Sequence, residues 1–306
     1  MNLKYFCLNF LIIYKIIMSK KKFFLKKPKW IRIKLPENFN KIQKIKNKLR
    51  KNNLHTVCES AQCPNLSECF SNGTVTFMIL GNICTRKCNF CAVLHGRPHS
   101  SIVDSEEPKK ILKIVNLMKI NHVVITSVNR DDLKDGGAQH FANCIKIIKK
   151  KNPNIKVEIL VPDFKKKHNL VLKILKKNPP DIFNHNIENV PRLYKKVRPG
   201  SNYKNSLNLL YKFKVQNPNI PTKSGLMLGL GETLKEVIQV LKDLKNHGVS
   251  MITIGQYLQP SKKHFPVQKY ASLKEFSELE KISFDIGFKN VFCGPLVRSS
   301  YHADIQ

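Results

Sequence analysis

Acidic residues are scarce in this chain of 306 residues, which has 21 Asp and Glu against 54 Lys and Arg and a formal net charge of +33. Such an excess predicts an anionic partner: a nucleic acid, an acidic protein or a membrane surface. The basic residues are almost all Lys scattered among Asn and Ile, however, and compositional drift gives the same signature. The sequence also lacks a basic motif interleaved with aromatic residues, and it lacks a C2H2 zinc finger. We therefore predict no nucleic-acid partner.

A long apolar run is also missing. The apolar stretch at residues 8–18 is interrupted by Asn9 and Lys15, and it is too short to span a bilayer. It has no clear signal-peptide cleavage site, so we predict a cytoplasmic protein with no membrane partner. An organelle is the alternative, because no acidic residue precedes Glu37 and the extension could be a transit segment. Met18 is a second candidate for the start of translation.

Cysteine is the residue that is unevenly distributed. Six of the nine cysteines fall in two clusters, which favours metal or iron–sulfur binding over a disulfide framework and implies a reducing compartment. We call Cys58, Cys63 and Cys69, with the spacing C-x4-C-x5-C, the first triad. The second triad, with the spacing C-x3-C-x2-C, consists of Cys84, Cys88 and Cys91.

The second triad follows an apolar run at residues 75–80 that is typical of a short buried strand. No fourth Cys or His follows at hairpin spacing, which argues against a zinc tetrahedron. Three thiolates on a cubane of four irons would leave one iron open to a small molecule. A zinc loop or buried structural thiols is the alternative interpretation. For the first triad the alternative is a zinc knuckle with a distant ligand, and the nearby second triad favours another cluster.

Apolar, β-branched runs alternate with helical patterns from residue 75 onward. The expected strands are 75–80, 122–128, 155–161, 181–187, 222–230 and 250–258. The expected helices are 39–51, 108–119, 138–151, 164–177, 207–216, 234–244 and 272–286. Alternation of this kind predicts an α/β protein with a parallel sheet and outer helices. Six units predict a partial (β/α)6 barrel of the TIM type, with its chemistry at the carboxyl ends of the strands.

Polar and glycine residues follow several of these strands. Each one alone is an ordinary loop or cap residue, but as a set at one rim they predict a ligand site. Paired glycines would let the backbone approach a carboxylate or amine, and a glutamate there could accept hydrogen bonds from ribose hydroxyls. The candidates are Asn129, Arg130, Asp131, Gly136, Gly137 and Glu188.

The second triad, with the aromatic Phe90 just before its third cysteine, resembles the radical S-adenosylmethionine (SAM) enzymes. Three further features narrow the resemblance: the first triad, the polar run at 129–132, and the tail Arg-Ser-Ser-Tyr at 298–301. Together they make the chain similar to the lipoyl synthase family from about Lys29 to its C-terminus. The two triads in this order, followed by this tail, are highly specific for the family, whereas either triad alone is not.

The resemblance implies two 4Fe–4S clusters and SAM as cofactors. The second triad would hold the SAM-cleaving cluster, and the first triad would hold an auxiliary cluster with Ser300 as its fourth ligand. Residues 298–301 offer two serines, Ser299 and Ser300, and the family match favours the latter. The activity would be that of a sulfurtransferase, which inserts sulfur from the auxiliary cluster at C6 and C8 of an octanoyl group.

The resemblance also implies partners and a division of the chain. The octanoyl group would be carried on a lysine of a lipoyl carrier domain, in E2 subunits of 2-oxoacid dehydrogenases or in the glycine cleavage H protein. A low-potential donor such as flavodoxin or ferredoxin would supply electrons. The expected segments are an extension at 1–28, disordered or mis-started, an arm with the first triad at 29–73, the partial barrel at 74–290, and a tail with the serine ligand at 291–306.

Overall fold

One sheet of eight strands organises the protein, whose computed structural model describes residues 25–33 and 39–305. Each strand pairs with the next one in the sequence. The first pair is antiparallel and the other six pairs are parallel. The strands are β1 (His55–Thr56), β2 (Thr76–Ile79), β3 (His122–Ser127), β4 (Lys156–Leu160), β5 (Ile182–Asn184), β6 (Thr222–Leu228), β7 (Met251–Gln256) and β8 (Asn290–Gly294).

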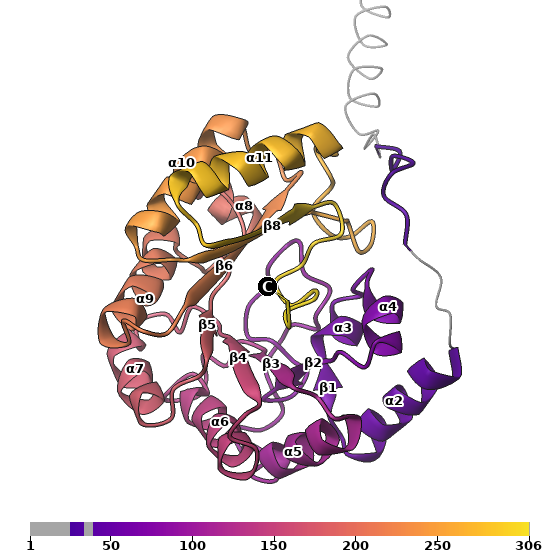
Figure 1. The fold of residues 1–306 in the computed structure, drawn as a ribbon, viewed down its shortest axis with the longest axis vertical. Coiled ribbons are helices and arrows are strands. Elements are labelled where there is room, and N and C mark those ends of the chain that lie inside the picture. Colours follow the sequence, from indigo (N-terminus) through magenta and orange to yellow (C-terminus); the bar gives the residue numbers. More distant parts are fainter. Residues whose placement is uncertain (1–24, 34–38, 306) are drawn as a thin grey trace, which may run out of the picture.

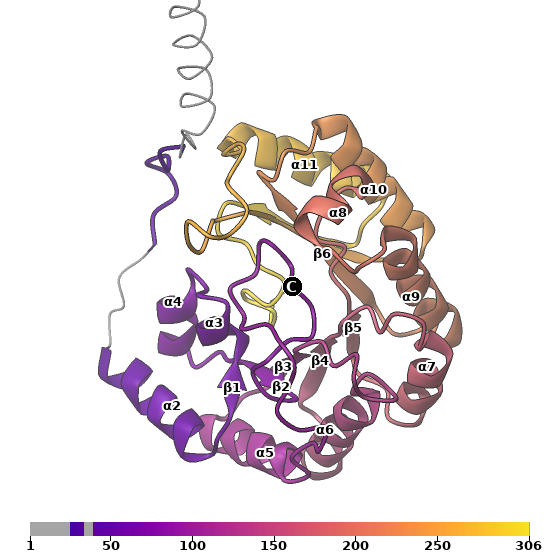
Figure 2. The same ribbon diagram turned by 180° about the vertical axis from the view of Figure 1, so that it is seen from behind.

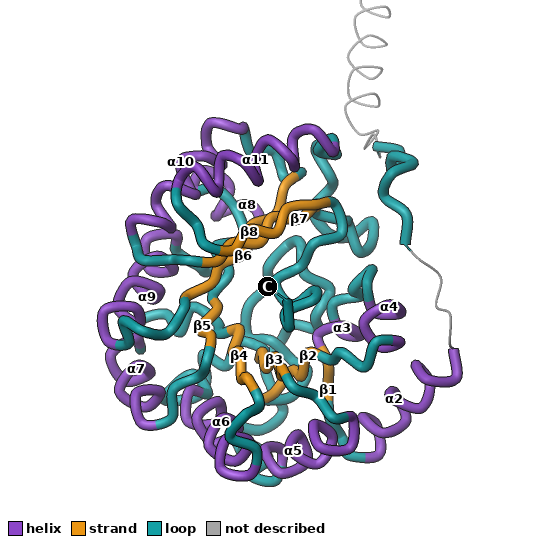
Figure 3. The backbone as a smooth tube through the Cα atoms, viewed as in Figure 1, coloured by secondary structure: helices purple, strands orange, loops and turns teal. Residues whose placement is uncertain are grey.

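The sheet curves into an open barrel with β1 and β8 at its two edges, and helices cover its outer face (Figures 1 and 3). Each parallel pair is connected through at least one of these helices, as βαβ units require. The outer helices are α5 (Glu107–Met118), α6 (Ala138–Lys151), α7 (His168–Lys177), α9 (Tyr203–Gln216), α10 (Leu234–Asn246) and α11 (Leu273–Ile286). A 3-10 turn η1 (Pro191–Leu193) and the short helix α8 (Tyr194–Val197) precede α9.

Helix α10 shows how local sequence builds this outer layer. Thr233 caps its N-terminus, and Glu236 completes a reciprocal capping box with the cap residue. Val237, Leu241 and Leu244 are buried on one face, which is the face that a period of 3.6 residues predicts. All six residues of β7 are buried, as expected for a strand with helices over one face and the barrel interior at the other.

The N-terminal arm and the C-terminal tail meet at the open side of the barrel. The arm consists of α2 (Phe39–Lys51), β1, α3 (Val57–Ser60) and α4 (Leu66–Ser71). The tail follows β8 and turns back inside the ring of strands, beside α3 and α4, in both views (Figures 1 and 2). Residues 1–24 of the predicted extension lie outside the described residues. Across 25–33 and 39–305, none of the helices combines the length and apolarity that a bilayer crossing needs.

The predicted fold class is confirmed, with two strands more than expected, the short antiparallel β1 and the parallel β8. All six predicted strands are present, and β8 adds a seventh parallel strand where the sequence showed only a short apolar run. Helix α7 begins later than predicted because Phe164 and Lys165 have φ angles of 47° and 45°, which a right-handed helix cannot include. Helix α9 begins earlier because the Asn202 side chain caps it by accepting from the Asn205 amide.

Candidate active site

The first triad and the tail together enclose a small cavity of about 20 Å³. Cys58 lies in α3, Cys69 lies in α4, and Cys63 lies in the loop between them. Ser300 from the tail lines the same cavity, whereas Ser299 does not. The remaining lining residues are Asn65, Thr74, Thr76, Arg298 and Tyr301. The three thiols of the first triad and the side chain of Ser300 therefore line one enclosed space.

Hydrogen bonds across more than 200 residues bring the tail to this position. The Asn65 side chain donates to the main-chain oxygen of Leu296 at 2.7 Å, and the Tyr301 hydroxyl donates to Glu68 Oε1 at 3.0 Å. Asn65 and Glu68 both belong to the segment that carries the first triad. The two bonds flank Ser300 in the chain, and they hold its hydroxyl at the thiols.

Burial makes the first triad a poor place for free thiolates. Burial, together with the neighbouring cysteines, raises the pKa of Cys58 to about 11 and that of Cys69 to about 12. Deprotonation of all three would need a compensating positive centre, and iron supplies such a charge. In the part of the chain that the structure describes, no three His, Cys, Asp or Glu side chains converge as the ligands of a single metal ion. The donors surround a space instead, which fits an iron–sulfur cluster.

The second triad lies on the loop after β2, and a buried arginine anchors that loop. Arg86 stands between the first two cysteines of the triad. Its Nη2 atom donates to Asp131 Oδ1 at 3.0 Å and to Asp163 Oδ1 at 2.9 Å. Burial opposes ionisation of both carboxyls, but the guanidinium beside them keeps the pKa of each below its ordinary value, helped at Asp163 by Arg198. The loop is therefore fixed to the ends of two neighbouring strands, β3 and β4.

Backbone amides point at the first sulfur of this triad. The amide N–H groups of Arg86 and Asn129 lie 3.4 Å and 3.3 Å from Cys84 Sγ, and the Asn129 side-chain amide lies 3.7 Å away. Hydrogen bonds to ligand sulfurs are one means by which a protein sets the potential of an iron–sulfur cluster. Burial raises the pKa of Cys88 to about 11 and that of Cys91 to about 12. The second triad thus has the same need for a positive centre as the first.

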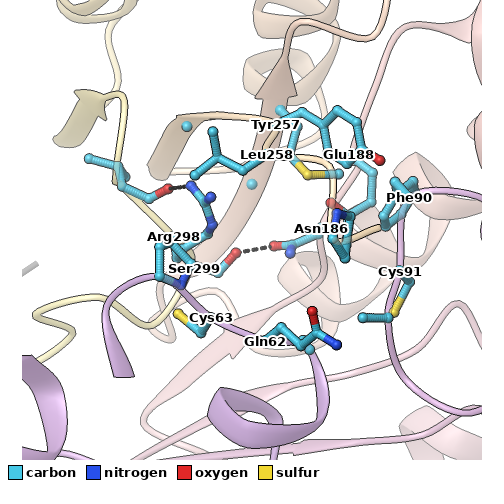
Figure 4. Close-up of a pocket in the computed structure, with 18 of the residues that line it drawn as sticks. Gln62, Cys63, Phe90, Cys91, Asn186, Glu188, Tyr257, Leu258, Arg298 and Ser299 are labelled. Atoms are coloured by element: carbon cyan, nitrogen blue, oxygen red, sulfur yellow. Dashed lines mark hydrogen bonds between the residues drawn. The ribbon is translucent and has the colours of Figure 1, made fainter. Parts of the chain in front are cut away.

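A cavity of about 580 Å³ lies inside the barrel and reaches both triads (Figure 4). Cys91 and Phe90 line it on one side, and Cys58, Cys63 and Ser300 line it on the other. Much of the remaining wall is apolar. Its members include Leu160, Leu226, Met227, Tyr257, Leu258 and Val297, together with Leu25 and Ile33 from the described segment 25–33.

Glu188 is the acidic side chain in the wall of this cavity. Its φ angle is 69°, an uncommon conformation for a residue with a side chain. Two main-chain hydrogen bonds of 2.9 Å, to Gly225 and from Met227, hold it in that conformation. Burial raises its pKa, although Arg198 and Arg298 act in the opposite direction. Arg198 also interacts electrostatically with Cys88 of the second triad, and Arg298 with Cys63 of the first, so the charge of Glu188 is coupled to one arginine at each triad.

Family comparisons agree with this geometry. The model of the radical SAM superfamily matches residues 78–244, and the model of the N-terminal domain of lipoyl synthase matches residues 14–63. A lipoyl synthase of Buchnera aphidicola subsp. Cinara cedri is 67% identical over 97% of this chain and 96% of the relative. One of Wigglesworthia glossinidia brevipalpis is 63% identical over 95% and 92%, and one of Vibrio atlanticus is 60% identical over 97% and 92%.

The chain belongs to the lipoyl synthase family. Solved structures extend the likeness at the level of the fold. Streptococcus suis SuiB bound to S-adenosylmethionine aligns with a TM-score of 0.53 at 13% identity, over 75% of this chain and 53% of that one. Methylornithine synthase (PylB) aligns with a TM-score of 0.52 at 14% identity, over 88% and 84%.

The six rim residues that were predicted from the sequence occupy different environments in the structure. Glu188 lines the large cavity, and Asn129 contacts a sulfur of the second triad. Asp131 contacts Arg86 of the triad loop. Arg130 is buried, pairs with Asp132 at 2.7 Å, and lines a separate cavity of about 250 Å³.

The paired glycines have a packing role instead. Gly136 and Gly137 have φ angles of 65° and 92°, and Gly137 precedes α6 as its cap residue. Neither is among the residues that line the large cavity. A Cβ atom on Gly137 would lie 2.2 Å from the Leu80 side chain, so this glycine allows close packing against the end of β2.

Arg86 and Arg198 are two residues of the site that were not predicted from the sequence. Arg86 could have been suspected, since it stands within a cysteine motif, and a buried charge at such a place needs partners. Arg198 lies far from either triad in the sequence, in a segment with no recognisable motif. Only the fold brings it to Cys88.

Replacing Arg86 should disrupt the second triad. Arg86→Gln removes the guanidinium that pairs with both Asp131 and Asp163, and breaking a buried pair in this way typically costs about 3 kcal/mol or more. We expect a lower midpoint in urea unfolding and fewer irons retained by the second triad. Arg97→Gln, an exposed position on the same loop, is the control and should change stability by at most about 0.5 kcal/mol. Equal midpoints for the two variants would contradict the anchoring role.

Proposed function

We propose that the chain is a lipoyl synthase, which inserts two sulfur atoms at C6 and C8 of a protein-bound octanoyl group to give a lipoyl group. The observation that carries the proposal is the large cavity, which reaches both triads and Ser300. A substrate chain held in this cavity would lie between a site that activates C–H bonds and a site that contains sulfur. Family membership supports the same activity.

The proposed ligands follow from the two triads. Cys84, Cys88 and Cys91 would hold one 4Fe–4S cluster, with the open iron facing SAM. A methylene C–H bond has no acidic proton, so acid–base groups cannot break it, and the cluster with SAM supplies a radical that can. The protein itself has to orient the substrate carbon and exclude water. The apolar wall formed by Leu160, Leu226 and other side chains of the cavity suits that task.

We assign the six rim residues different parts in SAM binding. Glu188 has the position for direct contact, because its carboxylate lies in the cavity wall. Asn129 and Asp131 would act on the loop of the second triad, by donating to Cys84 and by holding Arg86. Arg130, Gly136 and Gly137 would shape the rim from outside the cavity.

The first triad with Ser300 would hold the second 4Fe–4S cluster, which we propose is the sulfur substrate. Thiolates are soft ligands that suit iron in a sulfur-rich cluster, whereas a serine oxygen is hard and more basic. Protonation would release the serine readily and uncover one iron. A cluster that gives up sulfur must also lose iron, so a weak ligand is useful at this one corner. Each insertion would replace one C–H bond of the octanoyl chain by one C–S bond. The hydrogen atom would leave in 5′-deoxyadenosine derived from SAM, and the electron left over when carbon bonds to sulfide would be taken up by the iron of the auxiliary cluster.

The substrate and the electron source come from partner proteins. We propose octanoylated lipoyl domains of 2-oxoacid dehydrogenase E2 subunits and the glycine cleavage H protein as carriers, and flavodoxin or ferredoxin as the donor. The net charge of +33 would favour docking of an acidic carrier. The bacterial origin of the relatives supports a cytoplasmic location, and a reducing compartment suits two sets of free thiols.

Cleavage of SAM should depend on the second triad. Cys88→Ala removes one of three thiolate ligands, and two hold a cubane poorly. We expect no 5′-deoxyadenosine from this variant under strong reductant, measured by chromatography after anaerobic reconstitution. Cys144→Ala, at a buried position in α6, is the matched control and should retain cleavage. Normal SAM cleavage by Cys88→Ala would contradict the assignment of the second triad as cluster ligands. If metal analysis of the purified protein finds zinc in place of iron and acid-labile sulfide, the protein is a structural zinc protein instead.

The sulfur in the product should come from the first triad. The protein is reconstituted with heavy sulfide and allowed one turnover with unlabelled sulfide in solution. Mass spectrometry should find heavy sulfur at both positions of the lipoyl group. Cys63→Ala should still cleave SAM but give no lipoyl product. Product with only solution sulfur would refute the role of the auxiliary cluster as substrate.

Docking of the carrier should weaken with salt if the lysines take part in it. Exposed charges are screened beyond about 10 Å at 0.1 M ionic strength, so carrier affinity should fall between low and moderate salt. Calorimetric titration with an octanoylated carrier domain measures this, and a short octanoyl-lysine peptide without acidic residues is the control. An affinity that does not change with salt would mean that the excess of lysine plays no part in docking.

A further inference from the structure

The C-terminal tail enters the barrel over two glycines whose role is to provide space. A Cβ atom on Gly255 of β7 would lie 2.1 Å from the main-chain oxygen of Val297, and one on Gly225 of β6 would lie 2.7 Å from Ser299 Oγ. Real Cβ atoms do not approach other atoms so closely. Neither glycine has a positive φ angle, so it is the room for the tail, and not the backbone conformation, that requires glycine here.

The Ser299 side chain points to the barrel wall, where one residue receives it. Its hydroxyl donates to Asn186 Oδ1 at 2.7 Å (Figure 4). A Cβ atom on Gly225 would lie 2.6 Å from the same Asn186 oxygen. The hydrogen bond is therefore formed directly over Gly225, and any larger residue there would push both partners apart.

The Asn186 loop is itself held firmly. Arg198 Nη1 donates to the main-chain oxygen of Asn186 at 3.2 Å, and the amide of Glu188 donates to the oxygen of Gly225 at 2.9 Å. The acceptor for Ser299 thus lies on a segment fixed to β6. It can serve as a reference point for the position of the tail along the barrel.

We propose that Asn186 and Gly225 are positioning residues for the Ser300 ligand, which they act on through Ser299. The inference rests on the proposed function, because it takes Ser300 as a ligand of the auxiliary cluster. Ser299 bonds to the barrel wall while Ser300 lines the cavity of the first triad. A slip of one residue moves the chain by up to about 3.8 Å and would exchange the places of the two serines. The Asn186–Ser299 bond specifies which serine reaches the iron.

This contact is separate from the contacts that dock the tail. Asn65 and Glu68 hold the tail to the segment that carries the first triad, whereas Asn186 holds it to the barrel. Loss of the Asn186 contact should therefore leave the tail docked but its register less fixed. We expect a folded protein with an auxiliary cluster whose serine-ligated iron is held more weakly.

The test follows iron release from the auxiliary cluster and needs no catalytic turnover. The background is the full chain with the second triad replaced by alanine, so that only the auxiliary cluster assembles. Ser300→Ala gives the release rate without the serine ligand. Asn186→Ala and Gly225→Ala should speed transfer of the first iron to a chelator by up to about tenfold, the effect of losing one buried hydrogen bond. They should also shift the Mössbauer signal of the oxygen-ligated iron toward that of Ser300→Ala.

Asn189→Ala is the matched control for these variants. Asn189 is buried on the same loop, but its side chain donates to Met227 and Glu232 at 3.2 Å and not to the tail. Its iron release should stay within about twofold of the parent, which is below the effect of one hydrogen bond. A variant that combines Asn186→Ala with Ser299→Ala should release iron no faster than Asn186→Ala alone, because Asn186→Ala already removes the bond to Ser299.

The outcomes separate this inference from the proposed function. If the parent assembles no auxiliary cluster, or if Ser300→Ala leaves the iron signal unchanged, the ligand assignment fails and the proposed function with it. If Ser300→Ala acts while Asn186→Ala and Ser299→Ala behave as Asn189→Ala does, only the positioning role is wrong. Circular dichroism checks that each variant folds. Should Gly225→Ala not fold, Ser299→Ala alone decides, because it removes a single hydroxyl.

Discussion

The hydrogen bonds that return the C-terminal tail to α4 connect the two ends of a sheet that does not close. β8 and β1 are the edges of the barrel, and the tail after β8 reaches the segment between β1 and β2 through Asn65 and Glu68. The small cavity of the first triad and one wall of the large cavity depend on this connection. A single buried hydrogen bond contributes only about 0.5–1.5 kcal/mol, so a few bonds of modest strength complete the site.

Closure by a tail instead of a strand has a chemical consequence. A strand would fill the gap with a ladder of main-chain bonds, and every side chain would be fixed by the pleat. The tail instead supplies a hydroxyl from a segment held at a few points, so that hydroxyl can leave without unfolding a sheet. Elements of low local stability are where proteins place groups that have to move. A ligand that has to be released during turnover is well placed on such a segment.

How far the sequence predicts this structure depends on the range of each interaction. The strands and helices follow from local periodicity, and the predicted helix starts at α7 and α9 were wrong where a single φ angle or cap decided them. β8 was missed because its apolar run is too short to stand out. The cysteine triads are visible because their spacing is local. Gly225 gave no signal, and Asn186 stood out only as one polar residue after a predicted strand, since their partner Ser299 is more than 70 residues away and their role is steric or positional.

Charged and apolar side chains are separated inside the barrel. Arg198 interacts electrostatically with Cys88 of the second triad, Arg298 interacts with Cys63 of the first, and both arginines favour the charged form of Glu188. Thiolate-ligated clusters carry negative charge, which nearby arginines stabilise where water is excluded. The apolar wall lies between the triads, where a hydrocarbon chain would bind. Homolytic cleavage of a C–H bond separates no charge, so that wall needs no acid or base at the reacting carbon. Under the proposed function, the ionic side chains of the barrel would serve the clusters and SAM, and the apolar ones would serve the substrate.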